Sequence, residues 1–302
     1  MISPIVFWSS ALGVTFLVAG IWTYRRDLLA SSSHAGGGFL ALAPVFIAAP
    51  LATFAGEHFT IAKSLAPFVP KWIPAHLFMA YFVGVALLSA ALSFVARRCL
   101  RWSTILLAIM FALFVLLMDL PATLAHPTTR LNWILAARQG TFAMGGLALF
   151  SIAIRDRWPK PSHRLAAIAA FWTGMVIIFY GVEHIIHPQI TPGVPSSKLT
   201  SSWVPLPLEL AYLTGALLIA FGAAMFIRKY VGSAGRLAGL LMLLLTLVLY
   251  VPEFFLARTV PQRVLAINYI FDTLLFSGTL LAVARANLVS ESKPISSAQT
   301  AI

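Results

Sequence analysis

The sequence predicts an all-α fold, a polytopic bundle of about nine membrane-spanning helices. Hydrophobic residues make up 60% of the chain, charged residues only 10%, and the mean hydropathy is +0.91. A water-soluble globule of 302 residues does not have this composition. The apolar residues also gather in runs of about 20, the length that crosses the hydrocarbon core as a helix. Composition and run length therefore predict the same class, an integral membrane protein.

Apolar runs between charged or Pro/Gly-rich breaks are the predicted spans. They cover residues 3–23, 39–56, 75–96, 103–121, 132–154, 165–184, 206–227, 236–254 and 264–285. The run at 39–56 is the weakest, because Pro50 interrupts it. No basic residue precedes the first run, and Arg25-Arg26-Asp27 follows it, which favours a retained helix over a cleaved signal peptide.

Basic residues orient the predicted bundle, because Lys and Arg stay on the cytoplasmic side during insertion. Most of them fall on one side: Arg25, Arg26, Arg97, Arg98, Arg101, Arg155, Arg157, Lys160, Arg164, Arg228, Lys229, Arg236, Arg285 and Lys293. This pattern predicts a multi-pass protein of the cell (inner) membrane, with its N-terminus outside and its C-terminus in the cytoplasm. The net charge of +12 is dispersed over short loops, which favours the lipid bilayer as partner and excludes nucleic acid.

A repeat divides the chain. Segments 72–84 and 203–215 are identical at six of thirteen positions. One constant offset relates Trp72, Tyr81, Gly84, Arg98 and Pro121 to Trp203, Tyr212, Gly215, Lys229 and Pro252. Predicted helices two to five therefore recur as six to nine. Because each unit has an even number of helices, the two units form parallel repeats.

The predicted domains follow from this repeat. An extra N-terminal helix and loop cover residues 1–38, the first four-helix unit covers 39–160, and the second covers 161–289. The polar tail at 290–302 is expected to be disordered.

Acids and histidines gather in the predicted outer half, where ionisable side chains at membrane depth indicate function. The acids there are Glu57, Asp119, Glu183, Glu209, Glu253 and Asp272, and the histidines are His58, His76, His126, His184 and His187. Each unit carries an adjacent pair, Glu57-His58 or Glu183-His184. We expect these four residues to line an outward-facing vestibule and to handle protons as the catalytic groups.

Further residues are candidates for ligand contact: Arg138, His187, Glu253, Asp272, Trp72 and Trp203. Arg138 lies about two turns inside its span and needs a partner. Asp272 lies at a comparable depth, and Asp119, Glu253 or a bound anion are alternatives. The two tryptophans also suit an aromatic belt at the membrane interface.

No metal site is predicted. His184 and His187 are spaced to share a metal on one helix face, but Pro188 is expected to end that helix. Histidines that hydrogen-bond loop backbone are the other interpretation of these rings.

Several short motifs resemble the DoxX-like superfamily of four-helix membrane proteins. They are Gly181-Val182-Glu183-His184-Ile185-Ile186-His187-Pro188, then Trp203-Val204-Pro205 after a proline-rich loop, then Tyr212-Leu213-Thr214-Gly215. Segment 57–84 is similar more loosely, so the chain resembles two DoxX-like units in tandem. The resemblance implies a membrane subunit with a redox or quinone-linked role, as in thiosulfate:quinone oxidoreductase. It also implies a quinone as cofactor and a redox partner protein or a small lipophilic molecule as partner.

Two functions remain open at this stage. In the first, the protein is a quinone- or redox-linked subunit of an oxidoreductase, with an outward-facing Glu/His site. It then takes electrons from a partner, because the sequence has no flavin or nucleotide motif and only one cysteine, Cys99. In the alternative, it is a non-catalytic carrier or binding protein for a small molecule, lipid or ion, with repeats that rock about a central site.

Overall fold

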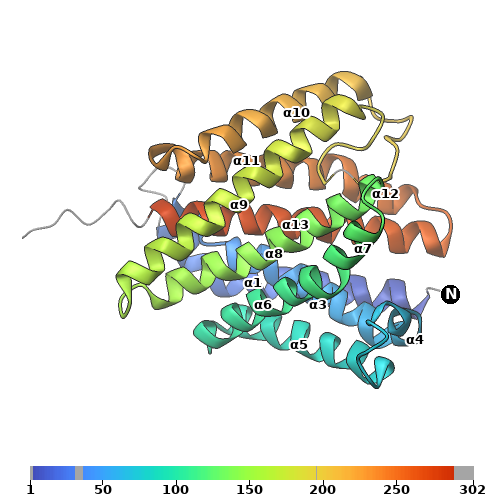
Figure 1. The fold of residues 1–302 in the computed structure, drawn as a ribbon, viewed down its shortest axis with the longest axis horizontal. Coiled ribbons are helices and arrows are strands. Elements are labelled where there is room, and N and C mark those ends of the chain that lie inside the picture. Colours follow the sequence, from blue (N-terminus) through green and yellow to red (C-terminus); the bar gives the residue numbers. More distant parts are fainter. Residues whose placement is uncertain (1–2, 31–36, 195, 289–302) are drawn as a thin grey trace, which may run out of the picture.

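The computed structural model describes residues 3–30, 37–194 and 196–288, and it is all-helical over these ranges. The long helices run roughly along one direction, so the bundle has two distinct ends (Figure 1). Within the described ranges the only bridge-type pairing joins Ile190 to Leu199, in a loop at one end. The predicted all-α class is confirmed. The tail at 290–302 lies outside the described residues.

The long helices follow the predicted order. They are α1 (Pro4–Ala30), α3 (Ala43–Thr60), α5 (His76–Ala96), α6 (Leu100–Phe114), α8 (Arg130–Ile154), α9 (Pro159–Ile186), α10 (Pro207–Ala224), α11 (Val231–Leu245) and α13 (Val260–Leu288). Shorter pieces are α2 (Gly37–Leu40), α4 (Ala62–Leu65), η2 (Ala66–Phe68), η3 (Val115–Asp119), α7 (Leu120–Ala125), η4 (Arg228–Tyr230), η5 (Thr246–Tyr250) and α12 (Val251–Leu256). Helix α6 continues through η3 into α7, and α11 continues through η5 into α12.

Eight helices in the described part of the chain are long and apolar enough to cross a membrane. They include every predicted span except 132–154, which corresponds to α8. Helix α8 has 25 residues and is therefore about 37 Å long. Polar residues in its first half, including Arg130 and Arg138, lower its hydropathy. It lies inside the bundle against α6, α9 and α13, where protein surrounds these polar groups.

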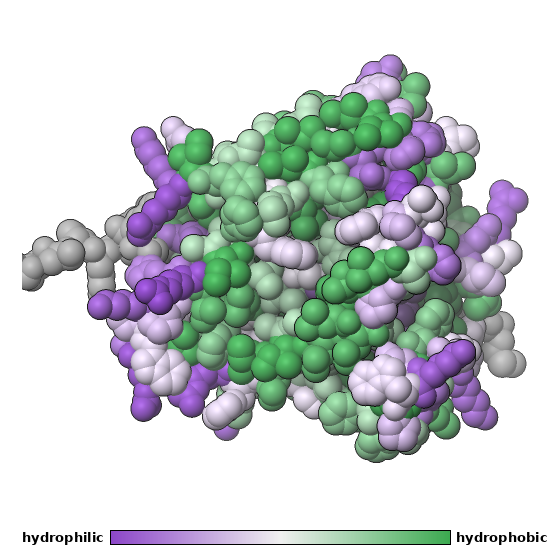
Figure 2. Space-filling model, viewed as in Figure 1, coloured by the Kyte–Doolittle hydropathy of each residue, from purple (hydrophilic) through white to green (hydrophobic). Residues whose placement is uncertain are grey.

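Helices α8 and α13 form the centre of the bundle and pack against each other. Helix α13 also packs against α3 and α11, while α8 packs against α6 and α9. Outer helices expose large apolar side chains, for example Trp22 on α1, Phe82 on α5 and Leu244 on α11. Figure 2 shows the result on one face, a largely apolar band between two more polar ends. This surface is typical of a protein in contact with lipid.

The two ends of the bundle differ in charge. At one end, called the basic end below, α1 and α5 finish near Arg25 and Arg97, and α8 finishes beside Arg155. At the other, called the acidic end below, α3 finishes after Glu57 and α9 after Glu183. The segregation predicted from the sequence is therefore present in space. Which end faces the cytoplasm stays a prediction.

Prolines shape the acidic end without breaking the bundle. Helix α3 runs through Pro50 and is almost entirely buried, because neighbouring helices cover the backbone that proline disturbs. Pro121 and Pro252 each follow a π-helical turn, η3 and η5. A widened turn removes the clash between a proline ring and the carbonyl one turn earlier. Both turns thus have the same local cause.

Candidate functional site

Each predicted Glu-His pair lies in the last turn of its helix, at the acidic end. Glu57 on α3 accepts a hydrogen bond of 3.1 Å from Asn268 Nδ2 on α13. Glu183 on α9 forms an ion pair with Arg130, the first residue of α8. Each glutamate therefore contacts the central helix from the other half of the chain. This crossed arrangement connects the two halves where the vestibule was predicted.

The two histidines of these pairs bind backbone. The His58 ring donates from Nδ1 to Phe54 O, 2.9 Å away and one turn earlier on α3. The His184 ring is fully buried, and its Nε2 lies 3.1 Å from both the backbone N and the backbone O of Gly193. His184 Nδ1 is buried and has no hydrogen-bond partner within the part of the chain that the structure describes. In this structure both rings form hydrogen bonds with backbone atoms, and those of His184 fix the loop that follows α9.

Arg138 lies at the centre of the site. It forms an ion pair with Asp272 on α13, and both side chains are largely buried. The pairing between the fifth and ninth predicted spans is therefore confirmed. Arg138 Nε is buried with no hydrogen-bond partner, so one donor of the guanidinium is unused by the described residues. A buried unpaired donor of this kind costs about 1–3 kcal/mol unless water or a ligand binds it.

Two further carboxyl groups interact with this ion pair, one with each of its members. Asp119, at the end of η3, interacts electrostatically with Arg138, and Glu57 interacts with Asp272. The Asp119 Oδ2 atom is buried and has no hydrogen-bond partner in residues 3–30, 37–194 and 196–288. Ionised together, these groups would leave an excess of negative charge in a region of low dielectric. The cluster therefore has the composition of a site that takes up a proton or a cation.

A layer of aromatic rings lies next to the Arg138–Asp272 ion pair, on the side toward the basic end. Phe142 follows Arg138 by one turn on α8, and Phe276 follows Asp272 by one turn on α13. Their ring centroids are 6.4 Å apart, and Phe276 also contacts Tyr180 at 5.4 Å. Phe111 on α6 extends the layer, and all four rings are buried. The polar cluster is thus separated from the basic end by packed aromatic side chains.

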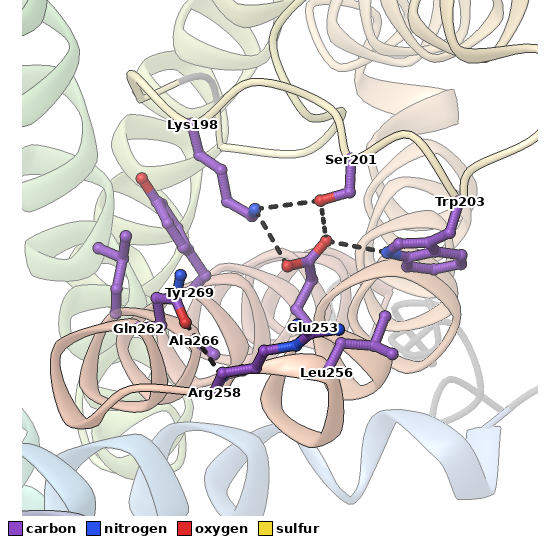
Figure 3. Close-up of a pocket in the computed structure, with 11 residues that line it drawn as sticks. Lys198, Ser201, Trp203, Glu253, Leu256, Arg258, Gln262, Ala266 and Tyr269 are labelled. Carbon is purple, nitrogen blue, oxygen red and sulfur yellow. Dashed lines mark hydrogen bonds and ion pairs between the residues drawn. The ribbon is translucent and has the colours of Figure 1, made fainter.

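A cavity of about 360 Å³ opens at the acidic end, between the loop at 187–206, α12 and the start of α13. Its volume falls within the usual range of ligand sites. The loop contributes Lys198, Ser201 and Trp203, which converge on Glu253 of α12 (Figure 3). Lys198 Nζ lies 3.1 Å from Glu253 Oε2, Trp203 Nε1 donates to Oε1 at 3.1 Å, and Ser201 donates to the same oxygen.

The other walls of the cavity come from the chain between α12 and α13. Leu256 and Leu265 are apolar, whereas Arg258 and Gln262 are polar and lie near the rim. Tyr269 closes the inner side, where its ring stacks on Tyr250 at 5.8 Å and its hydroxyl accepts from Ser196 at 2.8 Å. Asn268 is the next residue along, so one turn of α13 connects the cavity to Glu57.

The remaining predicted residues lie elsewhere. Trp72 is 70% exposed and does not line the cavity, in contrast to Trp203. His187 caps the end of α9. No group of three or more metal-ligating side chains occurs within the described ranges. Residues that the prediction missed as site residues are Lys198, Ser201, Tyr269, Asn268 and Arg130.

For two of these missed residues, Asn268 and Tyr269, the sequence offered an indirect indication. They match Asn132-Trp133 in the first half of the chain. Nothing local in the sequence placed Lys198 or Ser201 over Glu253, because loop closure decides that contact.

Comparison of the chain with protein-family models, with curated proteins and with solved structures finds no match.

Proposed function

We propose that this integral membrane protein binds a small lipophilic molecule with oxygen acceptors, of the quinone type, in the cavity at the acidic end. The observation that carries the proposal is the cavity itself, which combines apolar walls with hydrogen-bond donors beside a cluster rich in carboxyl groups. In this role the protein is a redox-linked membrane subunit. Electrons come from a partner protein, and the chain contributes binding, orientation and proton exchange.

The cavity walls fit such a ligand chemically. Leu256, Leu265 and the Trp203 ring offer apolar surface for a ring, and Gln262 and Tyr269 offer polar groups for its oxygen atoms. The Glu253 carboxylate is already bound by three side chains, so it stiffens the wall and is not free to bind the ligand.

Proton exchange is assigned to Glu57, His58, Glu183 and His184, with Asp119 as a further acid. The support for Glu57 is the most direct, because its carboxyl group interacts with Asp272, whose partner Arg138 also interacts with Asp119. Tyr180, which interacts electrostatically with Arg138 and Glu183, links the two sides of the cluster. A ligand that gains or loses charge would shift a proton in this group.

The architecture we propose is a tandem pair of DoxX-like units with nine spans, α8 being the ninth. Helices α3, α5, α6 and α8 pack consecutively, each on the next, as do α9, α10, α11 and α13. Ala75 and Leu206, related by the offset of the repeat, both adopt a left-handed backbone conformation just before a helix. The π-helical turns η3 and η5 obey the same offset.

The packing of two glycines supports the same duplication. A Cβ added to Gly84 would lie 2.8 Å from His58 Cβ, and one added to Gly215 would lie 3.3 Å from His184 Cβ. The helix that follows each Glu-His pair therefore crosses the histidine at a glycine in both units. For the orientation, we propose the inner membrane with the basic end in the cytoplasm.

The test of ligand binding is calorimetric titration of the detergent-purified protein with a short-chain benzoquinone. Trp203→Leu is expected to raise the dissociation constant about tenfold, a loss of about 1.4 kcal/mol of binding free energy. Trp72→Leu, the matched change in the first unit, is expected to leave it unchanged. Binding that is insensitive to Trp203→Leu would place the ligand elsewhere. No binding by the folded wild-type protein would reject the quinone class.

The proton assignment has its own test, the pH change on ligand binding in weak buffer. Glu57→Gln is expected to abolish the proton exchanged per bound ligand, because the amide does not titrate. Glu209→Gln, an exposed change in the first turn of α10, serves as the control. An unchanged proton count in Glu57→Gln would remove Glu57 from the mechanism.

A carrier for a small molecule, lipid or ion is the second candidate, favoured by the matching packing of the two halves. Transport through the bundle requires the Phe142–Phe276 layer to open, since these rings separate the polar cluster from the basic end. Uptake of the quinone analogue or of protons into proteoliposomes would support the carrier. Binding without uptake would support the one-sided site.

A further inference from the structure

A second, smaller cavity lies at the basic end, far from the acids of the candidate site. Its volume is about 90 Å³, about the space of three water molecules. Arg97 and Arg285 line it together with Tyr24 and Thr104. The rest of its wall is apolar and includes Leu100, Leu149 and Ile152. Six helices, α1, α3, α5, α6, α8 and α13, thus meet around a pair of guanidinium groups.

Arg97 is held in an unusual position. It ends α5 with a left-handed backbone conformation, φ 57°, which is strained for a residue with a side chain. Its guanidinium lies 4.6 Å from the centre of the Tyr24 ring and 2.8 Å from Asp27. Tyr24 in turn donates to Phe94 O at 3.0 Å. These contacts fix the guanidinium at the mouth of the cavity.

Positive charge exceeds negative charge around this cavity. Arg285 is close enough to Tyr24, Asp27 and Arg97 to interact with their charges. Arg155 donates to Ala286 O at 2.6 Å, and its Nε is buried without a hydrogen-bond partner among the described residues. The pKa of Arg155 lies below its ordinary value, chiefly because burial disfavours the charged form, and Arg285 adds repulsion that Asp156 opposes.

Among the described residues, Asp27 and Asp156 are the acids that interact with Arg97, Arg155 or Arg285. Guanidinium groups bind phosphate oxygens through paired N–H donors, and an anion between them relieves their mutual repulsion. A cavity of about 90 Å³ has room for a phosphate group, and the acyl chains of a lipid would lie outside it, along the exposed apolar side chains of the bundle.

We propose that this cavity binds the phosphate group of an anionic phospholipid, with Arg97 and Arg285 as its ligands and the acyl chains along the apolar outer surface of the bundle. The site is independent of the quinone proposal, because it lies at the other end of the bundle and shares no residue with it. Its expected role is to hold α1, α5 and α13 together at the basic end.

The experiment is native mass spectrometry and thermal unfolding of the full-length protein in neutral detergent. Dioleoyl phosphatidylglycerol and dioleoyl phosphatidylcholine are titrated separately. The wild-type protein is expected to retain one phosphatidylglycerol with a preference of about tenfold. Arg97→Gln/Arg285→Gln is expected to lose that preference. Arg228→Gln/Lys229→Gln removes two exposed cations at the same end, outside the cavity, and is expected to keep it.

The same preference for phosphatidylglycerol in the wild type and in both double variants would overturn the proposal. An equal loss of that preference in both double variants would also overturn it, because it would indicate binding to general surface charge. If the arginine-to-glutamine variant fails to fold, Arg97→Lys/Arg285→Lys keeps the charge and is expected to weaken the preference, because lysine lacks the paired donors. An unchanged preference in that folded variant would also count against the site. Equal stabilisation by inorganic phosphate alone would assign the cavity to a soluble anion and reject the lipid.

Discussion

A π-helical turn followed by a proline occurs at the acidic end in both halves of the chain, but the residue that ends the turn differs. In the first half η3 ends at Asp119, and in the second half η5 ends at Tyr250. Asp119 has a buried oxygen without a partner, whereas the Tyr250 hydroxyl donates to Pro192 O at 2.9 Å. The same backbone conformation therefore ends in a carboxyl group with an unpartnered oxygen in the first half and in a hydroxyl that binds a loop in the second.

The loops differ accordingly. The loop at 187–206 is fixed by Tyr250, by His184 and by Glu253, and it covers the cavity. In the first half, Ala122 occupies the position that corresponds to Glu253, and His58 bonds only to its own helix. The two halves of the chain thus differ at this end. The loop of the second half covers a cavity, and the first half carries Asp119, whose Oδ2 has no hydrogen-bond partner among the described residues.

The largest expected effect tests what joins the two halves. Arg138→Ala leaves Asp272 buried without its cation, and removing one partner of a buried pair costs about 3–5 kcal/mol. We expect the unfolding free energy, measured by denaturant titration in detergent, to fall by that amount.

The matched control removes both charges. Arg138→Met/Asp272→Leu is expected to recover most of the stability, because no charge is left buried alone. A double variant as unstable as Arg138→Ala would show that packing around Arg138, not its charge, holds the halves together.

An intermediate effect is expected where each unit crosses its histidine-bearing helix. The Cβ in Gly215→Ala would lie 2.8 Å from Gly181 O, a backbone atom that cannot move without shifting α9. Overpacking of this kind costs about 1–3 kcal/mol, partly offset by about 0.5–1 kcal/mol from better helix propensity.

Gly84→Ala is the counterpart in the first unit. Its added Cβ would lie 2.8 Å from His58 Cβ, which is fixed to the backbone of α3, and 2.9 Å from the Phe59 ring, which can turn away. Because α3 must shift in this variant as α9 must in Gly215→Ala, we expect a loss of unfolding free energy in the same range of about 1–3 kcal/mol, measured under the same conditions. A loss confined to one of the two variants would mean that only one of the two crossings is tightly packed.

Much of this arrangement follows from the sequence, and the reasons for the rest are specific. Apolar run length predicted the helices, and the cost of burying Arg138 predicted a partner such as Asp272. Span 132–154 forms α8, yet its polar residues reduce the signal that identifies a membrane helix. The cavity was not predictable, because Lys198, Ser201 and Trp203 reach Glu253 only through the path of a loop. No local pattern encodes that path.

The smallest expected effect distinguishes the role of Tyr250 from that of Asp119. Tyr250→Phe removes one hydrogen bond to Pro192 O, a loss of about 1 kcal/mol, and should raise amide hydrogen exchange in the loop at 187–206. Asp119→Asn keeps the shape of the side chain and lowers the excess of carboxyl groups around Arg138. We expect it to leave exchange in that loop unchanged and stability equal or slightly higher. Faster exchange in this loop in Asp119→Asn, or unchanged exchange in Tyr250→Phe, would contradict this difference between Asp119 and Tyr250.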